Sequence, residues 1–116
     1  MAPVVLSIER PGKHAAIVRL ALPADHDAFA GHFPGRPILP GVVQLDWAIQ
    51  LAATCFGFEL RPATQVRVKF MHVIGPDPAD LWLSLRYDPS PAELAFEYRI
   101  GDTVAIGSPI VRLKVT

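Results

Sequence analysis

The chain has 116 residues, the size of one domain, because domains average ~150 residues. Hydrophobic residues make up 51% of the sequence, which is enough for a hydrophobic core and excludes a disordered chain. Basic and acidic residues number 11 each, and this zero net charge argues against nucleic-acid binding through bulk charge and favours self-association.

Two strands are predicted at the start of the chain. Val4–Arg10 and His14–Leu22 are rich in apolar and β-branched residues, and Pro11-Gly12 between them is a typical turn pair. We therefore expect a hairpin here. A short helical turn is predicted next, over Asp25–Ala30, with Asp25 as its N-cap.

One long helix is predicted, from Gly41 to about Phe56. Pro40 suits the first helical turn, and Gly57 suits the residue that ends the helix. The segment is apolar nearly all round, which is typical of a buried helix and not of one lying on the surface. We therefore expect this helix to form the centre of the domain.

The second half of the chain shows the period-2 alternation of antiparallel strands with one buried face. The predicted strands are Gln65–Met71, Leu81–Tyr87, Leu94–Ile100 and the region Thr103–Val115. The fold class is therefore α+β, with one antiparallel sheet wrapped around one central helix. Such a sheet leaves its edges and part of the helix uncovered, and a second copy of the chain would cover them.

The cysteine count and the lengths of the apolar runs disfavour disulfides, thiolate metal sites and membrane spans. Cys55 is the single cysteine, so an internal disulfide is impossible and a thiolate metal cluster is disfavoured. No run of ~18 uncharged apolar residues is long enough to cross a bilayer, and no signal peptide is recognised at the start. We expect a cytoplasmic protein without a membrane or nucleic-acid partner.

The segment from Gly31 to Gly41, which leads into the helix, is the best candidate for chemistry. Its prolines and glycines predict an ordered loop, and His32 within it follows a glycine that lets the backbone approach a ligand closely. At Gly41 the helix begins with backbone N–H groups that have no helical acceptor. Such groups can polarise a carbonyl or hold an oxyanion.

Asp46 is the second candidate, because aspartate inside an apolar helix is rarely buried without a partner. No basic residue lies one turn away, whereas Gln50 at i+4 can donate a hydrogen bond to it. We expect a desolvated carboxyl that forms an acid/base pair with His32. The alternatives are a structural loop histidine and a buried structural acid. The spacing of these residues does not suit a metal ligand set.

The sequence resembles a known family at Gly31-His32-Phe33-Pro34-Gly35, Pro37 and Pro40-Gly41-Val42, followed by Gln44, an acid at 46 and Gln50. The resemblance continues, more weakly, in Val68-Lys69-Phe70 and Ile74-Gly75-Pro76. These motifs resemble the 3-hydroxyacyl-[acyl-carrier-protein] dehydratases, which have the hotdog fold. The resemblance implies a single hotdog dehydratase domain over residues 1–116.

The resemblance also implies a reaction and a site. A (3R)-hydroxyacyl thioester would lose water to become a trans-2-enoyl thioester at the interface of a dimer. His32 of one chain would take the α-proton, and Asp46 of the other would protonate the departing hydroxyl. The Gly41 N–H would hold the thioester carbonyl, with Val42 and Phe33 also binding substrate, and Gln50 would orient Asp46.

The implied partners follow from the substrate. An acyl carrier protein would deliver the acyl group on its phosphopantetheine arm, so neither a metal nor a dissociable cofactor is needed. We expect a homodimer, and a higher oligomer or a pairing with another hotdog subunit remains open. Arg36, Arg61, Arg67 and Lys69 could form a basic patch for the acidic carrier protein.

One departure from the family pattern concerns the pathway. The dehydratases of general fatty-acid synthesis usually have glutamate where this chain has Asp46, and the run Pro40–Ala48 is most similar to the aryl polyene type. This favours fatty-acid-like or aryl polyene biosynthesis. Two alternatives are a hotdog acyl thioesterase and a non-catalytic acyl-binding subunit of a heteromeric complex.

Overall fold

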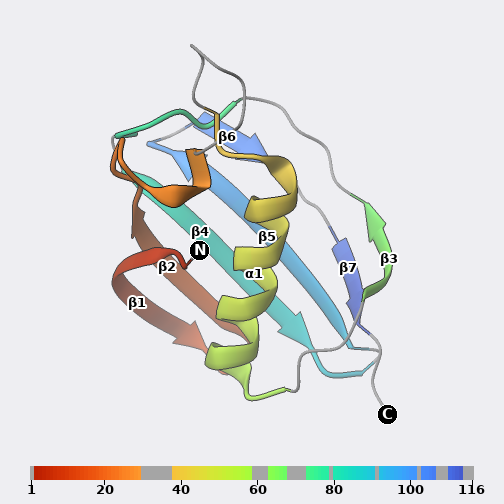
Figure 1. Cartoon of the computed structure of the whole chain (residues 1–116). Helices are drawn as coiled ribbons and strands as arrows, with labels where there is room; N and C mark the ends of the chain where they lie inside the picture. The colour runs from red at the N-terminus through yellow and green to blue at the C-terminus, as the bar shows by residue number, and fades with distance from the viewer. Residues whose placement is uncertain are drawn as a thin grey trace.

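A computed structural model of the chain describes residues 2–29, 38–58, 63–67, 73–78, 80–90, 92–101, 103–106 and 110–113. In this structure a single antiparallel sheet curves around one long helix, α1 (Gly41–Phe56), which lies across one face of the sheet (Figure 1). The predicted fold class, a hotdog-like α+β domain, is therefore confirmed.

The sheet contains seven strands in the order β1-β2-β4-β5-β7-β3, with β6 paired to β5. All of their pairings are antiparallel. The strands are β1 (Val4–Gly12), β2 (Ala15–Ala21), β3 (Ala63–Arg67), β4 (Leu81–Asp88), β5 (Glu93–Ile100), β6 (Thr103–Ile106) and β7 (Ile110–Leu113). The predicted strand region Thr103–Val115 thus contains two strands, and both of them pair with β5.

The first hairpin turns two residues later than predicted. Gly12 pairs with Ala15 across the hairpin, so the turn consists of Lys13 and His14, and Pro11 belongs to β1. An irregularity in the pairing between Glu9 and Gly12 accommodates the proline, which has no N–H to donate to the neighbouring strand. The proline therefore marks a bulge in the strand.

The helix has the predicted bounds, and both of its ends have a local cause. Pro40 is extended, with φ −61° and ψ 144°, and therefore lies outside the helix. At the other end Gly57 takes the left-handed conformation, with φ 75°, and its N–H donates to the Ala53 carbonyl at 2.8 Å. A residue with a Cβ adopts that conformation at a cost, which explains why a glycine ends this helix.

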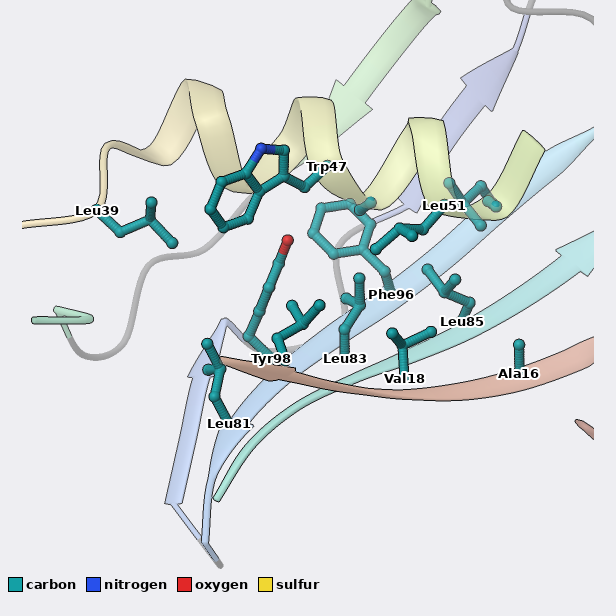
Figure 2. Packing of buried hydrophobic residues seen from close by; sticks show 14 of the residues in the cluster. Ala16, Val18, Leu39, Trp47, Leu51, Leu81, Leu83, Leu85, Phe96 and Tyr98 are labelled. Atoms are coloured by element: carbon teal, nitrogen blue, oxygen red, sulfur yellow. The ribbon is translucent and has the colours of Figure 1, made fainter. Parts of the chain in front are cut away.

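The hydrophobic core lies between α1 and the sheet (Figure 2). From the helix, Trp47 and Leu51 point toward the strands, and both are buried. The side chains that meet them come from three neighbouring strands, and alternate residues of each strand face the helix. These sheet residues are Ala16 and Val18 from β2, Leu81, Leu83 and Leu85 from β4, and Phe96 and Tyr98 from β5.

The opposite side of α1 is not covered by the sheet. Val42, Asp46, Gln50 and Thr54 follow one another at intervals of four residues and are all exposed. Val42, the apolar member of this stripe, is 72% exposed. The expectation that one sheet layer leaves part of the helix uncovered is therefore confirmed for the single chain.

Among the strands that the structure describes, β1 and β3 lie at the two ends of this order, and β6 pairs with β5 alone. Every residue of β1 is exposed, including four large apolar side chains: Val4, Val5, Leu6 and Ile8. The expectation that one sheet layer leaves its edges uncovered holds for this strand.

Candidate active site at the start of α1

The first turn of α1 presents free backbone donors. The Pro40 carbonyl accepts hydrogen bonds from the N–H groups of Val43 and Gln44, both at 3.1 Å. Among the described residues no acceptor faces the N–H groups of Gly41 and Val42, and no side chain caps the helix. Unpaired N–H groups at a helix N-terminus carry partial positive charge, so they can bind a carbonyl oxygen and stabilise negative charge developing on it.

Asp46 lies on the exposed stripe of the same helix. Its position five residues after Gly41 places it about 7 Å further along the axis, because each helical residue rises ~1.5 Å. The Gln50 Nε2 donates a hydrogen bond to Asp46 Oδ2 at 2.7 Å, which confirms the contact predicted from their spacing. This bond holds one carboxylate oxygen, and the other accepts no hydrogen bond from the residues that the structure describes.

The expectation of a desolvated Asp46 is wrong for the single chain. Its side chain is exposed, because it lies on the side of α1 that the sheet does not cover. A role as a buried structural acid does not fit this position. The carboxylate can instead meet a molecule or a second subunit that approaches the uncovered side of the helix.

The structure brings four of the predicted site residues together: Gly41, Val42, Asp46 and Gln50 all lie in the first three turns of α1. Residues 30–37, which include His32 and Phe33, lie outside the described part of the chain. The pairing of His32 with Asp46 therefore stays a prediction. The described chain ends just before this segment, at Phe29, and resumes just before the helix, at Ile38.

Beneath the first turns of α1 lies a buried polar contact that the sequence analysis missed. The Tyr98 hydroxyl of β5 donates a hydrogen bond to the Gln44 main-chain carbonyl at 2.7 Å. Burial, and secondarily the negative charge of Asp46, raise the pKa of Tyr98 far above its ordinary value. The hydroxyl therefore remains a neutral donor. The sequence pattern places a tyrosine on the buried face of this strand. Because a buried tyrosine hydroxyl usually forms a hydrogen bond, that pattern could have predicted a buried acceptor near Tyr98.

His26, just before the short helix that follows β2, has a partner for each of its ring nitrogens. Its Nδ1 accepts a hydrogen bond from the Ala28 N–H at 3.0 Å, and its Nε2 lies 2.8 Å from the Ala2 carbonyl. Its ring also meets the Trp47 ring edge-on, with centroids 5.3 Å apart. His26, and not Asp25, thus caps the short helix η1 (Asp27–Phe29) that precedes residues 30–37.

Cys55 lies near the other end of α1. Burial raises the pKa of its thiol, and the positive charge of Arg10 only partly opposes this effect. A raised pKa keeps the nucleophilic thiolate scarce, so this thiol is expected to be unreactive. The Arg10 guanidinium also donates to the Cys55 carbonyl at 2.6 Å.

Three other kinds of feature bear on function: metal sites, membrane spans and hollows in the surface. Within the described ranges, no three histidine, cysteine, aspartate or glutamate side chains are grouped so that they could hold a metal ion. In those ranges, no helix is both long and apolar enough to span a membrane. A hollow lined by Ile17, Ser84, Arg86, Ala95 and Glu97, among others, lies on the face of the sheet that points away from α1. It is therefore separate from the residues at the start of the helix.

The chain was compared with known proteins. Residues 8–108 match the family described as "ApeI-like: ApeI dehydratase". A chain of the structure called "The Dehydratase Heterocomplex ApeI:P from Xenorhabdus doucetiae" is 32% identical, with a TM-score of 0.87 over 98% of this chain and 100% of that chain.

Two curated relatives are named "3-hydroxyacyl-[acyl-carrier-protein] dehydratase FabZ". The protein from Paracidovorax citrulli is 32% identical over 75 residues, which are 65% of this chain and 49% of the relative. The protein from Gluconacetobacter diazotrophicus is 42% identical over 53 residues, which are 45% of this chain and 33% of the relative. The match thus spans about a third to a half of the length of these relatives. From the family match over residues 8–108, we conclude that the chain belongs to the ApeI-like dehydratase family.

Proposed function

We propose that this protein dehydrates a (3R)-hydroxyacyl thioester carried on the phosphopantetheine arm of an acyl carrier protein. The product is the trans-2-enoyl thioester. The observation that carries the proposal is the exposed Asp46, held by Gln50 on the helix whose first turn presents the Gly41 N–H, a donor without an acceptor among the described residues. An acid and an oxyanion-binding donor on one rigid helix are two of the three parts that this elimination requires.

The third part is a base, for which we propose His32. It removes the proton from C2 of the substrate while the thioester carbonyl oxygen accepts a hydrogen bond from the Gly41 N–H. That hydrogen bond stabilises the negative charge that develops on the oxygen as the C–H bond breaks. Val42, which is 72% exposed beside this donor, and Phe33 provide apolar surface for the acyl chain.

Asp46 then completes the elimination. Its protonated carboxyl donates a proton to the 3-hydroxyl, the C3–O bond breaks, and water leaves as the double bond forms between C2 and C3. His32 ends with one proton more and Asp46 with one fewer, and exchange with solvent restores both. Gln50 keeps the carboxyl oriented through its hydrogen bond, so Gln50 positions the acid and does not itself react. No step in this reaction needs a metal or a dissociable cofactor.

We further propose that the working enzyme contains two hotdog subunits. The uncovered stripe of α1 and the exposed apolar side chains of β1 support this proposal, because groups of exposed apolar side chains mark sites of protein–protein contact. The similarity to a chain of the ApeI:P heterocomplex favours a distinct second hotdog subunit as an alternative to a second copy. Aryl polyene or fatty-acid-like biosynthesis is the pathway class that we propose.

The proposal is tested by mass spectrometry of acyl carrier proteins loaded with 3-hydroxyacyl or 2-enoyl groups. The chain is assayed alone and together with a co-expressed second hotdog subunit. Loss or gain of the mass of one water supports the dehydratase, and activity only with the second subunit supports the mixed assembly. Release of free acid would instead identify a thioesterase. Binding without any conversion in either assembly would identify a non-catalytic acyl-binding subunit.

A further inference from the structure

The first turns of α1 are joined to the sheet by polar groups that lie entirely inside the core. Tyr98 of β5 is fully buried, and Figure 2 shows its hydroxyl pointing from the sheet up toward the helix, near Trp47. The acceptor of this hydroxyl is the Gln44 carbonyl, at 2.7 Å. A helix carbonyl has two lone pairs, so this bond comes in addition to the bond within the helix. It ties the backbone of α1 directly to β5.

The side chain of Gln44 makes a second link, to the segment before the helix. Gln44 is only 3% exposed, and its Nε2 donates to the Leu39 carbonyl at 3.0 Å. The Leu39 N–H in turn donates to the Ile74 carbonyl at 2.8 Å. A chain of hydrogen bonds thus runs from Tyr98 of β5 to Gln44 of the helix. It continues to Leu39, just before Gly41, and ends at Ile74.

This arrangement carries a cost that an apolar side chain would avoid. The Gln44 Oε1 is buried and has no hydrogen-bond partner among the described residues. Burying an unpaired acceptor is unfavourable, and a methionine of similar length would fill the same space without it. The Gln44 amide makes one hydrogen bond that methionine could not make, to the Leu39 carbonyl. This bond fixes the position of the residues around Gly41.

The two links lie close to the proposed site in the chain. Leu39 lies two residues before Gly41, and Gln44 lies two residues before Asp46. We propose that Tyr98 and Gln44 are positioning residues, which hold the first turns of α1 so that the Gly41 N–H and the Asp46 carboxyl keep the separation that the elimination needs. This inference rests on the proposed function. Neither residue needs to touch the substrate, because both act through the backbone of the helix.

The test compares Tyr98→Phe with Tyr87→Phe. Tyr87 is also a nearly buried tyrosine on the helix-facing side of the sheet, but it stacks on Phe56 and Phe58 at the far end of α1. We expect Tyr98→Phe to lower kcat about tenfold, with KM changed less than about twofold, because misplaced catalytic groups slow the chemical step more than binding. Tyr87→Phe should leave both constants close to those of the unchanged chain. Equal kcat values for the two variants would overturn the proposal.

Hydrogen exchange provides a readout that does not depend on activity. The Val43 and Gln44 amides, which form the first bonded turn, should lose protection in Tyr98→Phe and keep it in Tyr87→Phe. If the unchanged enzyme shows no dehydratase activity, the proposed function fails, and this measurement still decides whether Tyr98 fixes the helix. Unchanged protection in Tyr98→Phe would overturn the positioning role even in an active enzyme.

A second variant covers the case in which Tyr98→Phe does not fold. Gln44→Met removes the amide and its unpaired oxygen but leaves Tyr98 and the helix backbone in place. We expect the same tenfold order of loss in kcat, together with faster exchange at Val43. A Gln44→Met enzyme with unchanged kcat and exchange would show that the amide positions nothing.

Discussion

Gln50 donates a hydrogen bond to Asp46 Oδ2 at 2.7 Å, one helical turn away on the uncovered side of α1. The contact orients a carboxyl that is open to solvent in the single chain and that has no cation one turn away along its helix. An amide can hold the carboxyl in both of its protonation states, because the unprotonated oxygen accepts a hydrogen bond in either state. This property suits an acid that must release and regain a proton in each turnover.

Substituting Asp46 by asparagine tests whether its acidic proton, and not its size, is needed for turnover. Asp46→Asn keeps the size and the acceptor for Gln50 but cannot donate an acidic proton, so we expect kcat to fall by at least ~100-fold. The thermal midpoint should change little, because the site is exposed. Gln50→Met should lower kcat by only about tenfold, since the acid remains but is less well oriented. Rates and circular dichroism of the two variants check this, and a fully active Asp46→Asn enzyme would eliminate Asp46 as the acid.

Variants that lack the proposed base or the proposed acid can be mixed to test whether one site is shared between two copies of the chain. His32→Ala and Asp46→Asn homodimers should each be inactive. After subunit exchange, half of the dimers are mixed and each has one intact site, so about a quarter of the normal activity should return. Exchange is verified by native mass spectrometry of differently tagged chains. Mixed dimers that stay inactive would rule out a site shared between two identical subunits.

Arg10 is expected to stabilise the end of α1. Its guanidinium donates to the Cys55 carbonyl and to the Ala15 carbonyl, and it lies over the Phe56 ring at 4.9 Å. Arg10→Ala removes a cation from the negative end of the helix dipole and should cost about 1 kcal/mol of unfolding free energy. Urea denaturation measures this loss.

Arg86→Ala is the matched control for Arg10. Arg86 is exposed on β4 and forms no hydrogen bond or ion pair within the described residues. Its removal should change the unfolding free energy by less than ~0.5 kcal/mol. Equal effects of the two substitutions would show that capping by Arg10 contributes nothing.

The buried Tyr98 predicts a loss of stability at high pH. Its pKa in the folded chain is raised above the ordinary value of 10.0, by burial first and by Asp46 second. Above about pH 10 the unfolded chain loses the phenolic proton while the folded chain keeps it, so folding becomes less favourable as the pH rises. The expected slope approaches ~1.4 kcal/mol per pH unit and should be absent in Tyr98→Phe. Urea titrations of both chains between about pH 9 and pH 11 would reveal equal slopes if the prediction is wrong.

His26 is expected to matter for stability although it lies outside the proposed chemistry. With Nδ1 accepting from Ala28 and Nε2 donating to the Ala2 carbonyl, the neutral ring satisfies two backbone groups. His26→Ala should cost about 1–2 kcal/mol of unfolding free energy. The exposed His14 is the control, since His14→Ala should change stability by less than ~0.5 kcal/mol. Similar losses in both variants would contradict the role of His26.

The sequence alone determined the features that depend on local patterns. The helix Gly41–Phe56 was predicted with its bounds, because Pro40, Gly57 and a continuous apolar run are local signals. The alternating strands and the Asp46–Gln50 contact were likewise predictable, because each depends on neighbours a few residues away. The hotdog fold was implied by the resemblance of the sequence motifs to a known family.

Only the tertiary structure decided which side of the helix is covered. The sequence predicts that one sheet layer leaves part of the helix uncovered. It does not show that the stripe through Val42 and Asp46 is that part, so the exposure of Asp46 was not foreseen. The Tyr98–Gln44 and His26–Trp47 contacts join residues far apart in the chain, and no local pattern encodes their register. Long-range contacts of this kind follow from how the sheet curves around α1, because the curvature determines which distant side chains meet.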